Sequence, residues 1–150
     1  MPAIWLSPHF SLRELTASAT AERLGIDNAP SADVLGNLSY LAARLEEVRD
    51  LVEQPLSITS GFRCSRLNEA VGGVSTSAHL RGLAADMVCP RFGSPLKLCR
   101  TIAGSGIGWD QLIYEHGWAH LGFDPVGIPR RQILTRLRDG AYVAGLREIS

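Results

Sequence analysis

The sequence predicts an α+β fold, in which a small antiparallel sheet has its helices packed on one side. Residues 34–51 place apolar side chains at three- and four-residue steps, which is the period of a long helix with one buried face. Residues 56–60, 83–88, 111–115 and 118–123 are short apolar or alternating runs bounded by turn residues, as is typical of strands. Helices that cover one face of such a sheet give an α+β domain.

The first third of the chain predicts two helices and a strand. Ser11 and Glu14 have the spacing of a capping box, so a short helix should begin there. After the turn-like residues 28–31, the long core helix should end near Glu53, before Pro55. A strand over residues 56–60 should then break at Gly61.

The middle of the chain predicts a helix over residues 65–71, stopped by the pair Gly72-Gly73. A loop rich in serine and threonine then leads to His79. The later elements are a strand over 83–88, a helix over 94–103, and a hairpin in which the strands 111–115 and 118–123 flank His116-Gly117. Residues 132–137 fit either a strand or a short helix, and a turn at Asp139-Gly140 precedes residues 141–146.

Bulk properties predict one domain, residues 1–150, that works as a monomer, because a chain of 150 residues can bury its own core. The formal net charge is zero, without a basic run, so neither nucleic acid nor a membrane is an expected partner. The first residues lack the pattern of a secretory signal peptide. Cys64, Cys89 and Cys99 match no zinc-finger spacing and are expected to be free thiols, mostly buried.

One carboxylate and two imidazoles form the candidate metal site: His79, Asp86 and His120. A histidine taken alone is more often structural, but a carboxylate in a strand of Ala, Met and Val needs a partner. The three side chains are the inventory of a catalytic zinc site whose fourth position stays open for water.

Strand alternation supports this grouping. Asp86 shares a face with Ala84, and His120 shares a face with Gly122, because side chains alternate along a strand. His120 should therefore face a cleft, next to a glycine that lets a substrate backbone approach closely.

Glu115 is the candidate general base, and this assignment comes from the hairpin. If His116 and Gly117 form a two-residue loop, then Glu115 pairs with Trp118, and Ile113 pairs with His120. Glu115 then lies on the face of His120, with a diagonal separation of about 7–8 Å between Cα atoms, which leaves room for a water.

Arg63 is the second candidate catalytic residue, since its fixed cation suits a substrate carboxylate or an oxyanion; the alternative is an ordinary surface arginine. Ser77 fits a substrate hydrogen-bond donor or a loop cap. Trp118 and Trp109 each fit either the core or the wall of a substrate cleft, whereas His116 is expected in a turn and His9 on the surface. Residues 72–76 and 91–94 are expected to form cleft-wall loops.

The pattern Ser77-x-His79-x-x-Gly82-x-Ala84-x-Asp86, followed by Trp118-x-His120, resembles the zinc peptidases that comprise D-alanyl-D-alanine carboxypeptidases and L-alanyl-D-glutamate endopeptidases. The likeness is closest to the compact single-domain type of bacteriophages and prophages. It extends to residues 6–15, 60–63 and 110–115, and it covers residues 6–123. Residues 124–150 form a C-terminal extension that is expected to pack on the domain.

The resemblance implies that His79, Asp86 and His120 bind Zn²⁺ and that the substrate is the stem peptide of peptidoglycan. It implies roles for Arg63 in catalysis and substrate binding, and it is compatible with substrate contacts from Ser77 and Trp118. The enzyme would be made in the bacterial cytoplasm and act at the cell wall or in the periplasm, in phage lysis or as part of a virion.

One position departs from the family pattern. Several members carry the catalytic acid three residues before the last histidine, where this chain has Gly117. Two alternatives therefore stay open beside the enzyme: a non-catalytic zinc module of the same fold that serves as a structural or wall-binding part, and an interaction domain without metal.

Overall fold

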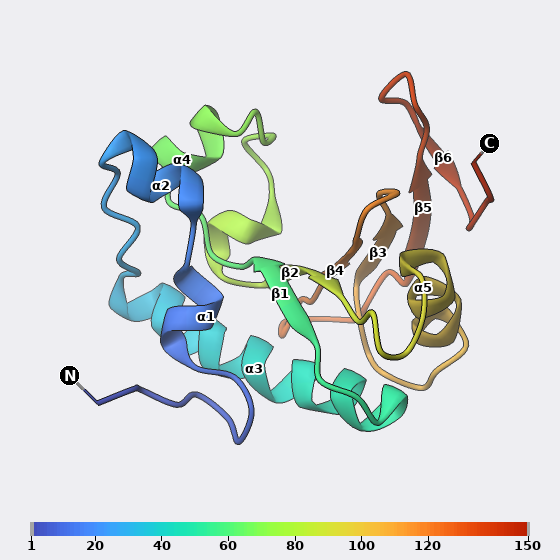
Figure 1. The fold of residues 1–150 in the computed structure, drawn as a ribbon, viewed down its shortest axis with the longest axis horizontal. Coiled ribbons are helices and arrows are strands. Elements are labelled where there is room, and N and C mark those ends of the chain that lie inside the picture. The colour runs from blue at the N-terminus through green and yellow to red at the C-terminus, as the bar shows by residue number, and fades with distance from the viewer. Residues whose placement is uncertain (1, 150) are drawn as a thin grey trace.

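A computed structural model describes residues 2–149, and its centre is one six-stranded sheet. The strands lie in the order β1-β2-β4-β3-β5-β6 (Figure 1). Their bounds are Ser57–Ser60 for β1, Ala84–Val88 for β2, Gln111–Tyr114 for β3, Ala119–Gly122 for β4, Gln132–Arg136 for β5 and Tyr142–Ala144 for β6.

The sheet is mixed, which corrects the expectation of a purely antiparallel one. Strands β3 and β5 are parallel, whereas every other neighbouring pair is antiparallel. The reason lies in the connection after β4. After β4 the chain crosses β3, and β5 joins the sheet on the side of β3 that faces away from β4. Strand β5 runs opposite to β4, and since β4 is antiparallel to β3, β5 runs in the same direction as β3.

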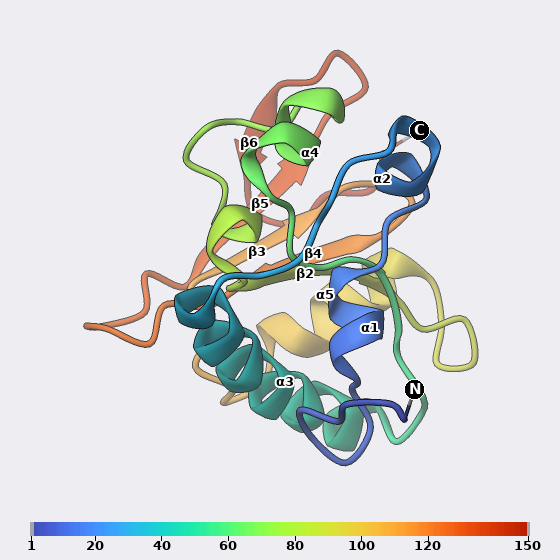
Figure 2. The same cartoon turned by 90° about the vertical axis from the view of Figure 1, so that its left-hand side faces the viewer.

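The helices lie on both sides of the sheet, as Figure 2 shows. Helices α1 (Leu12–Thr16), α3 (Ala32–Val52) and α5 (Pro95–Ala103) lie on one side of the sheet, as predicted. The short helices α4 (Ser65–Ala70) and η1 (Ala78–Arg81) lie on the other side. No helix among residues 2–149 has the length and apolar character that a membrane span requires.

The hydrophobic core lies between the sheet and the α3 and α5 helices. The middle of the apolar stripe of α3 is fully buried there, together with Met87 of β2 and Leu121 of β4, whereas Leu35 and Leu51 near the two ends of the stripe are exposed. The opposite face of the same two strands carries Asp86 and His120. One face of the sheet therefore stabilises the fold by burying apolar area, and the other is left for polar side chains.

Local signals explain most helix boundaries. The Ser11 hydroxyl accepts a hydrogen bond from the amide of Glu14 at 3.1 Å, so the predicted cap of α1 is confirmed. Helix α3 ends at Val52 with Glu53 as its C-cap, which confirms the predicted end near Glu53. Helix α2 (Ala19–Leu24) was not predicted, because six residues are too few to display an apolar period, although Ser18 caps it in the same way.

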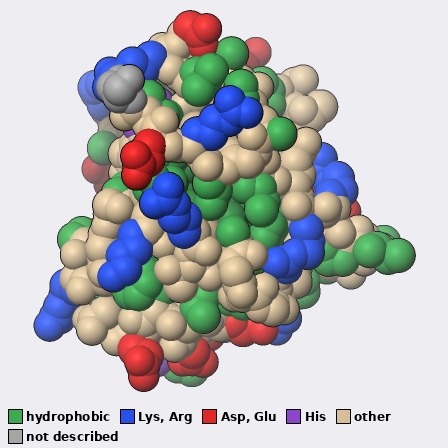
Figure 3. Space-filling model, turned by 90° about the vertical axis from the view of Figure 1, so that its right-hand side faces the viewer, with side chains coloured by type: hydrophobic (Ala, Val, Ile, Leu, Met, Phe, Trp, Pro, Cys, Tyr) green, Lys and Arg blue, Asp and Glu red, His purple; other side chains and the backbone are tan. Residues whose placement is uncertain are grey.

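Basic side chains cover aromatic rings beside α5 and β5. Figure 3 shows this face, on which arginine and lysine side chains surround a central apolar area. Lys97 of α5 lies 4.5 Å from the ring centre of Phe92, and the Arg131 guanidinium lies 4.2 Å from that of Trp109. Such contacts add a cation–π attraction to the cover that these side chains provide.

The N-terminal segment is fastened to α3 through Glu46. Its carboxylate accepts hydrogen bonds from the Ser7 hydroxyl at 2.5 Å and from the His9 amide at 2.7 Å, and the His9 ring lies 2.7 Å from the other oxygen. Burial by itself would raise the pKa of Glu46, but these hydrogen bonds and the charge of His9 outweigh it and hold the pKa below its ordinary value of 4.5.

Replacing Glu46 with glutamine should lower the free energy of unfolding by about 1–2 kcal/mol near neutral pH, because charge-assisted hydrogen bonds are lost. A depressed folded pKa stabilises the protein above the unfolded value and loses that contribution as the pH falls through the folded value. The difference between wild type and Glu46→Gln should therefore shrink in acid, which urea unfolding at several pH values measures. An equal difference at all pH values would contradict the assignment, and Glu69→Gln, on an exposed residue of α4, is the control.

Candidate metal centre

His79, Asp86 and His120 come together as the sequence predicts. One ligand atom from each lies within 4.8 Å of the others, and the three residues are 2%, 7% and 7% exposed. Three polar side chains that are this buried and this close need a common partner. The cluster has the donor set and the compactness of a metal site.

The sheet register places two of the three residues. Asp86 of β2 is the cross-strand partner of His120 of β4, so both side chains stand on the same face. His79 reaches them from η1, which Ser77 caps at its start and Gly82 caps at its end. The Ser77 hydroxyl accepts from the His79 amide at 3.2 Å and holds the start of this turn.

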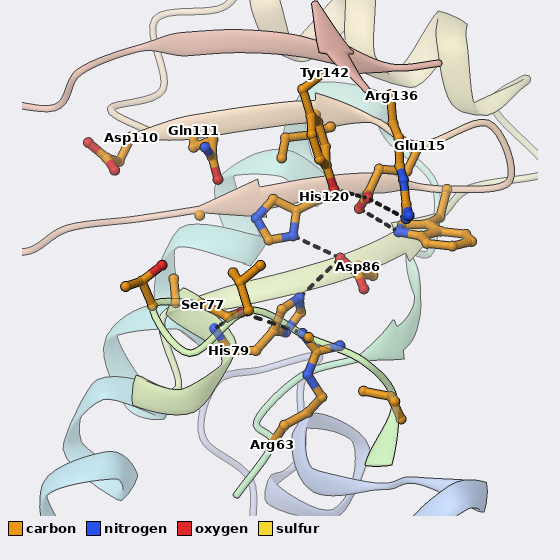
Figure 4. A pocket seen from close by; sticks show the side chains of 18 of the residues that line it. Arg63, Ser77, His79, Asp86, Asp110, Gln111, Glu115, His120, Arg136 and Tyr142 are labelled. Carbon is orange, nitrogen blue, oxygen red and sulfur yellow. Dashed lines mark hydrogen bonds and ion pairs between the residues drawn. The ribbon is translucent and has the colours of Figure 1, made fainter. Parts of the chain in front are cut away.

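His79 is oriented by the backbone of Gly61. Its Nδ1 lies 2.7 Å from the Gly61 carbonyl oxygen, and since a carbonyl only accepts, Nδ1–H is the donor. This leaves Nε2 facing Asp86 (Figure 4). A side chain at position 61 would collide with the backbone of Leu15, where a Cβ would lie 2.3 Å from the carbonyl oxygen, so only glycine brings this carbonyl to the site.

A metal ion fits this arrangement. His79 Nε2 lies 3.2 Å and His120 Nδ1 lies 3.0 Å from the same oxygen, Oδ1 of Asp86. With its proton on Nδ1, a neutral His79 presents a lone pair to a carboxylate oxygen, and two lone pairs repel each other. A divalent cation bound by all three groups removes this conflict, and the Gly61 carbonyl then acts as the outer partner that fixes the ligand.

Asp86 is held in its ionised form. Burial would raise the pKa of its carboxyl, but the hydrogen bonds and charges of His120 and His79 outweigh burial and lower the pKa well below the ordinary range. A carboxylate that stays ionised in a buried place is suited to binding a cation.

The cluster lies in a cleft of about 750 Å³ on the open face of the sheet. Figure 4 shows the metal cluster in the middle of this cleft, with Asp110 and Gln111 toward one end and Glu115 with Arg136 toward the other. The cleft wall also comes from the segment that precedes η1 and from the residues that follow β4. These wall residues are Val71, Gly72, Gly73, Val74, Thr76, Ser77, Arg81, Arg130 and Tyr142.

Arg63 and Ser77, both predicted, lie on one side of the cluster. Arg63 is half-buried and donates from Nη2 to the Ser77 hydroxyl at 3.4 Å, while its buried Nε has no hydrogen-bond partner among residues 2–149. Burial lowers the pKa of its guanidinium, which the charges of Asp86 and Glu115 partly oppose, and the group remains a cation. Both side chains line the cleft.

Glu115 and Trp118 lie as the hairpin predicts. Tyr114 pairs with Ala119 and Ile113 with His120, and the Glu115 amide donates to the Trp118 carbonyl at 3.1 Å. The predicted two-residue turn is therefore confirmed, with His116 in the left-handed conformation at φ 67°. Glu115 and Trp118 both line the cleft, and the Trp118 indole Nε1–H donates to Oε2 of Glu115 at 3.0 Å.

The C-terminal extension does more than pack on the domain. It supplies β5 and β6, and Arg130, Arg136 and Tyr142 from it line the cleft. Arg130 forms an ion pair with Asp110 at 2.8 Å, and this hydrogen bond lowers the pKa of the Asp110 carboxyl. The sequence did not reveal these residues, because which strand β5 joins depends on a non-local pairing.

Of the two loops that were expected to form the cleft wall, only one does so. Residues 72–76 contribute to the wall, but none of residues 91–94 does, so the prediction for that loop is wrong; the loop lies beside Lys97 at the start of α5. Trp109 is fully buried in the core, whereas His9 is paired with Glu46 at the surface.

The three cysteines are free thiols, as expected. Cys89 and Cys99 are buried, and Cys64 is half-buried. Burial, together with the charge of Glu115, raises the pKa of Cys99 to about 12, so this thiol stays protonated and unreactive.

An α+β domain with a buried His–Asp–His cluster in an open polar cleft has the metal-ligand set of a metallopeptidase. The family model described as Peptidase M15 matches residues 8–122, and the chain belongs to this family. The resemblance that the motifs indicate is thus confirmed. No curated protein matches the chain closely enough to be compared with it.

Proposed function

We propose that this protein is a zinc-dependent peptidase that hydrolyses peptide bonds in the stem peptides of peptidoglycan. The observation that carries the proposal is the His79, Asp86 and His120 cluster at the centre of a large open cleft, in a chain of the Peptidase M15 family. Zn²⁺ is the proposed ion because two imidazoles and one carboxylate leave a fourth position open.

The residues around the cluster supply the rest of the chemistry. When bound, Zn²⁺ would polarise the scissile carbonyl and lower the pKa of water toward about 7. Glu115 accepts a proton from the attacking water and passes it to the leaving amine. Arg63, whose side chain lines the cleft, binds the oxyanion or a substrate carboxylate through its guanidinium. Ser77 and Trp118 contact the substrate from the cleft wall.

Both endopeptidase and carboxypeptidase action fit this proposal, because stem peptides offer internal and terminal bonds. We further propose that the protein acts as a monomer at the cell wall or in the periplasm after synthesis in the bacterial cytoplasm, in phage lysis or as part of a virion. Two points support this setting: the proposed substrate is part of the cell-wall polymer, and the sequence motifs resemble those of compact phage enzymes.

The test is digestion of purified peptidoglycan by the zinc-loaded protein, with mass spectrometry of the released fragments. New amine and carboxyl termini within stem peptides are expected, and their position identifies the scissile bond. His120→Ala should release none. If the wild type creates no new termini in walls of several stem-peptide compositions, the enzyme proposal is wrong.

A second candidate is a non-catalytic zinc module of the same fold that binds the wall or serves as a structural part. Gly117 favours it, because this residue occupies the position where several family members carry the catalytic acid. Such a module would sediment with peptidoglycan and bind zinc without releasing fragments, so the same digestion separates the two candidates.

A further inference from the structure

The feature that stands out beyond the metal cluster is a row of side chains at the neighbouring ends of β4, β3, β5 and β6. Tyr114 pairs with Thr135 in the parallel β3–β5 ladder, so the next residues, Glu115 and Arg136, lie beside each other. Arg136 pairs in turn with Tyr142 of β6. Because Trp118 faces Glu115 across the hairpin, the row reads Trp118, Glu115, Arg136, Tyr142.

This row stands on the same face of the sheet as the metal ligands. Glu115 lies two positions after Ile113, which pairs with His120, and Trp118 lies two positions before His120 itself, so side-chain alternation puts them on the same face. The row is therefore the next one along the strands from Asp86 and His120. Figure 4 shows Glu115, Arg136 and Tyr142 at this end of the cleft.

Every member of the row contacts the Glu115 carboxylate. The Trp118 indole donates to Oε2 at 3.0 Å, the Tyr142 hydroxyl donates to Oε1 at 3.4 Å, and Arg136 Nη1 lies 3.8 Å from Oε1. The Arg136 guanidinium also lies 5.8 Å from the ring centre of Tyr142. Two side chains from the C-terminal extension thus face one oxygen of the candidate base, while Trp118 of the β3–β4 hairpin donates a hydrogen bond to the other.

Burial makes this contact set effective. The Glu115 side chain is only 11% exposed, whereas the Arg136 side chain is nearly half exposed, and so is the Tyr142 residue. The two exposed residues therefore stand between the carboxylate and the solvent. Burial and the charge of Glu115 raise the pKa of the Tyr142 hydroxyl, so it remains protonated and donates its hydrogen to the carboxylate.

We propose that the β5–β6 hairpin sets the position of the Glu115 carboxylate, with Arg136 and Tyr142 as positioning residues. Both lie in the extension, outside the residues 8–122 that the family model matches. The inference rests on the proposed function for its effect on catalysis. A carboxylate held at both oxygens keeps one orientation toward the attacking water, and a freely rotating one does not.

The first test is kinetic. Tyr142→Phe removes only the hydroxyl, and Arg136→Gln removes the charge. With a soluble stem peptide, kcat should fall by about three- to tenfold in the first and by about tenfold or more in the second, since general-base catalysis depends on orientation. KM and zinc content should stay within about twofold of wild type. Arg136→Lys should recover part of the loss.

Tyr40→Phe and Arg100→Gln are the matched controls, since Tyr40 packs on Phe123 and Arg100 pairs with Glu148 away from the cleft. Unchanged kcat in both Tyr142→Phe and Arg136→Gln would overturn the inference. A rise in KM without a fall in kcat would also overturn it, because it would mean that the residues bind substrate instead.

The second test does not depend on activity. The indole ¹H–¹⁵N resonance of Trp118, assigned with Trp118→Phe, reports the hydrogen bond to Glu115. This resonance should move in Tyr142→Phe and in Arg136→Gln, as it should in Glu115→Gln. If it moves only in Glu115→Gln, the hairpin does not position the carboxylate, whether or not the protein proves to be a peptidase. If it moves in all three but the wild type cleaves no wall, the proposed function alone is wrong.

Discussion

Asp86→Asn should abolish zinc binding and with it the hydrolysis of stem peptides. Oδ1 of Asp86 is the atom that both imidazoles approach, at 3.2 Å from His79 and 3.0 Å from His120, so the carboxylate supplies the negative charge at the centre of the cluster. An asparagine of the same shape offers a neutral oxygen in its place, which binds a divalent cation far less strongly. Metal polarisation contributes several kcal/mol, so kcat/KM should fall by at least about a thousandfold.

Metal analysis after dialysis and thermal unfolding with added zinc check this expectation. Zinc at about a hundred times its dissociation constant stabilises a wild-type site by about 2.7 kcal/mol, so the midpoint should rise for wild type and stay constant for Asp86→Asn. Asp50→Asn, on an exposed residue of α3, should behave like wild type. A variant that retained both zinc and activity would show that Asp86 is not a ligand.

Glu115→Gln should lower kcat by about a hundred- to ten-thousandfold, which is the contribution of general acid–base catalysis. The variant should retain its zinc, because Glu115 is not among the three clustered ligands. A glutamine can still accept the Trp118 hydrogen bond that Oε2 accepts in the wild type, so the hairpin should keep its structure. What is lost is the group that takes the proton from water.

Steady-state kinetics on a stem peptide, together with zinc analysis, measure this effect. Glu22→Gln, on an exposed residue of α2, is the matched control. Full activity in Glu115→Gln would assign the proton transfer to another group and leave the metal ligands unaffected. Loss of zinc in this variant would instead point to a structural role for Glu115.

Much of the site could be predicted because its parts are local in sequence. His79 and Asp86 belong to one short motif, and the pairing of Ile113 with His120 follows from a two-residue turn whose register leaves little choice. Period-two alternation then placed Asp86 and His120 on the open face of the sheet, opposite Met87 and Leu121. The cap at Ser11 and the end of α3 at Glu53 were likewise readable from neighbouring residues.

The parts that could not be predicted depend on distant pairings. Residues 132–137 were compatible with a strand or a short helix, and nothing near them specifies that β5 pairs with β3 in parallel. The Gly61 carbonyl reaches His79 only because glycine allows the chain to pass against the backbone of Leu15. The wall expected at residues 91–94 is instead supplied in part by Arg136 and Tyr142.

Spacing within short stretches was enough to identify the three candidate ligands, the hairpin that carries Glu115, and membership of a peptidase family. The contacts around them follow from the folded arrangement: His79 and His120 approach the same oxygen of Asp86, and Arg136 and Tyr142 reach Glu115. Such contacts join residues far apart in the chain. Their geometry is set by sheet order and by packing against the core, which no local pattern encodes.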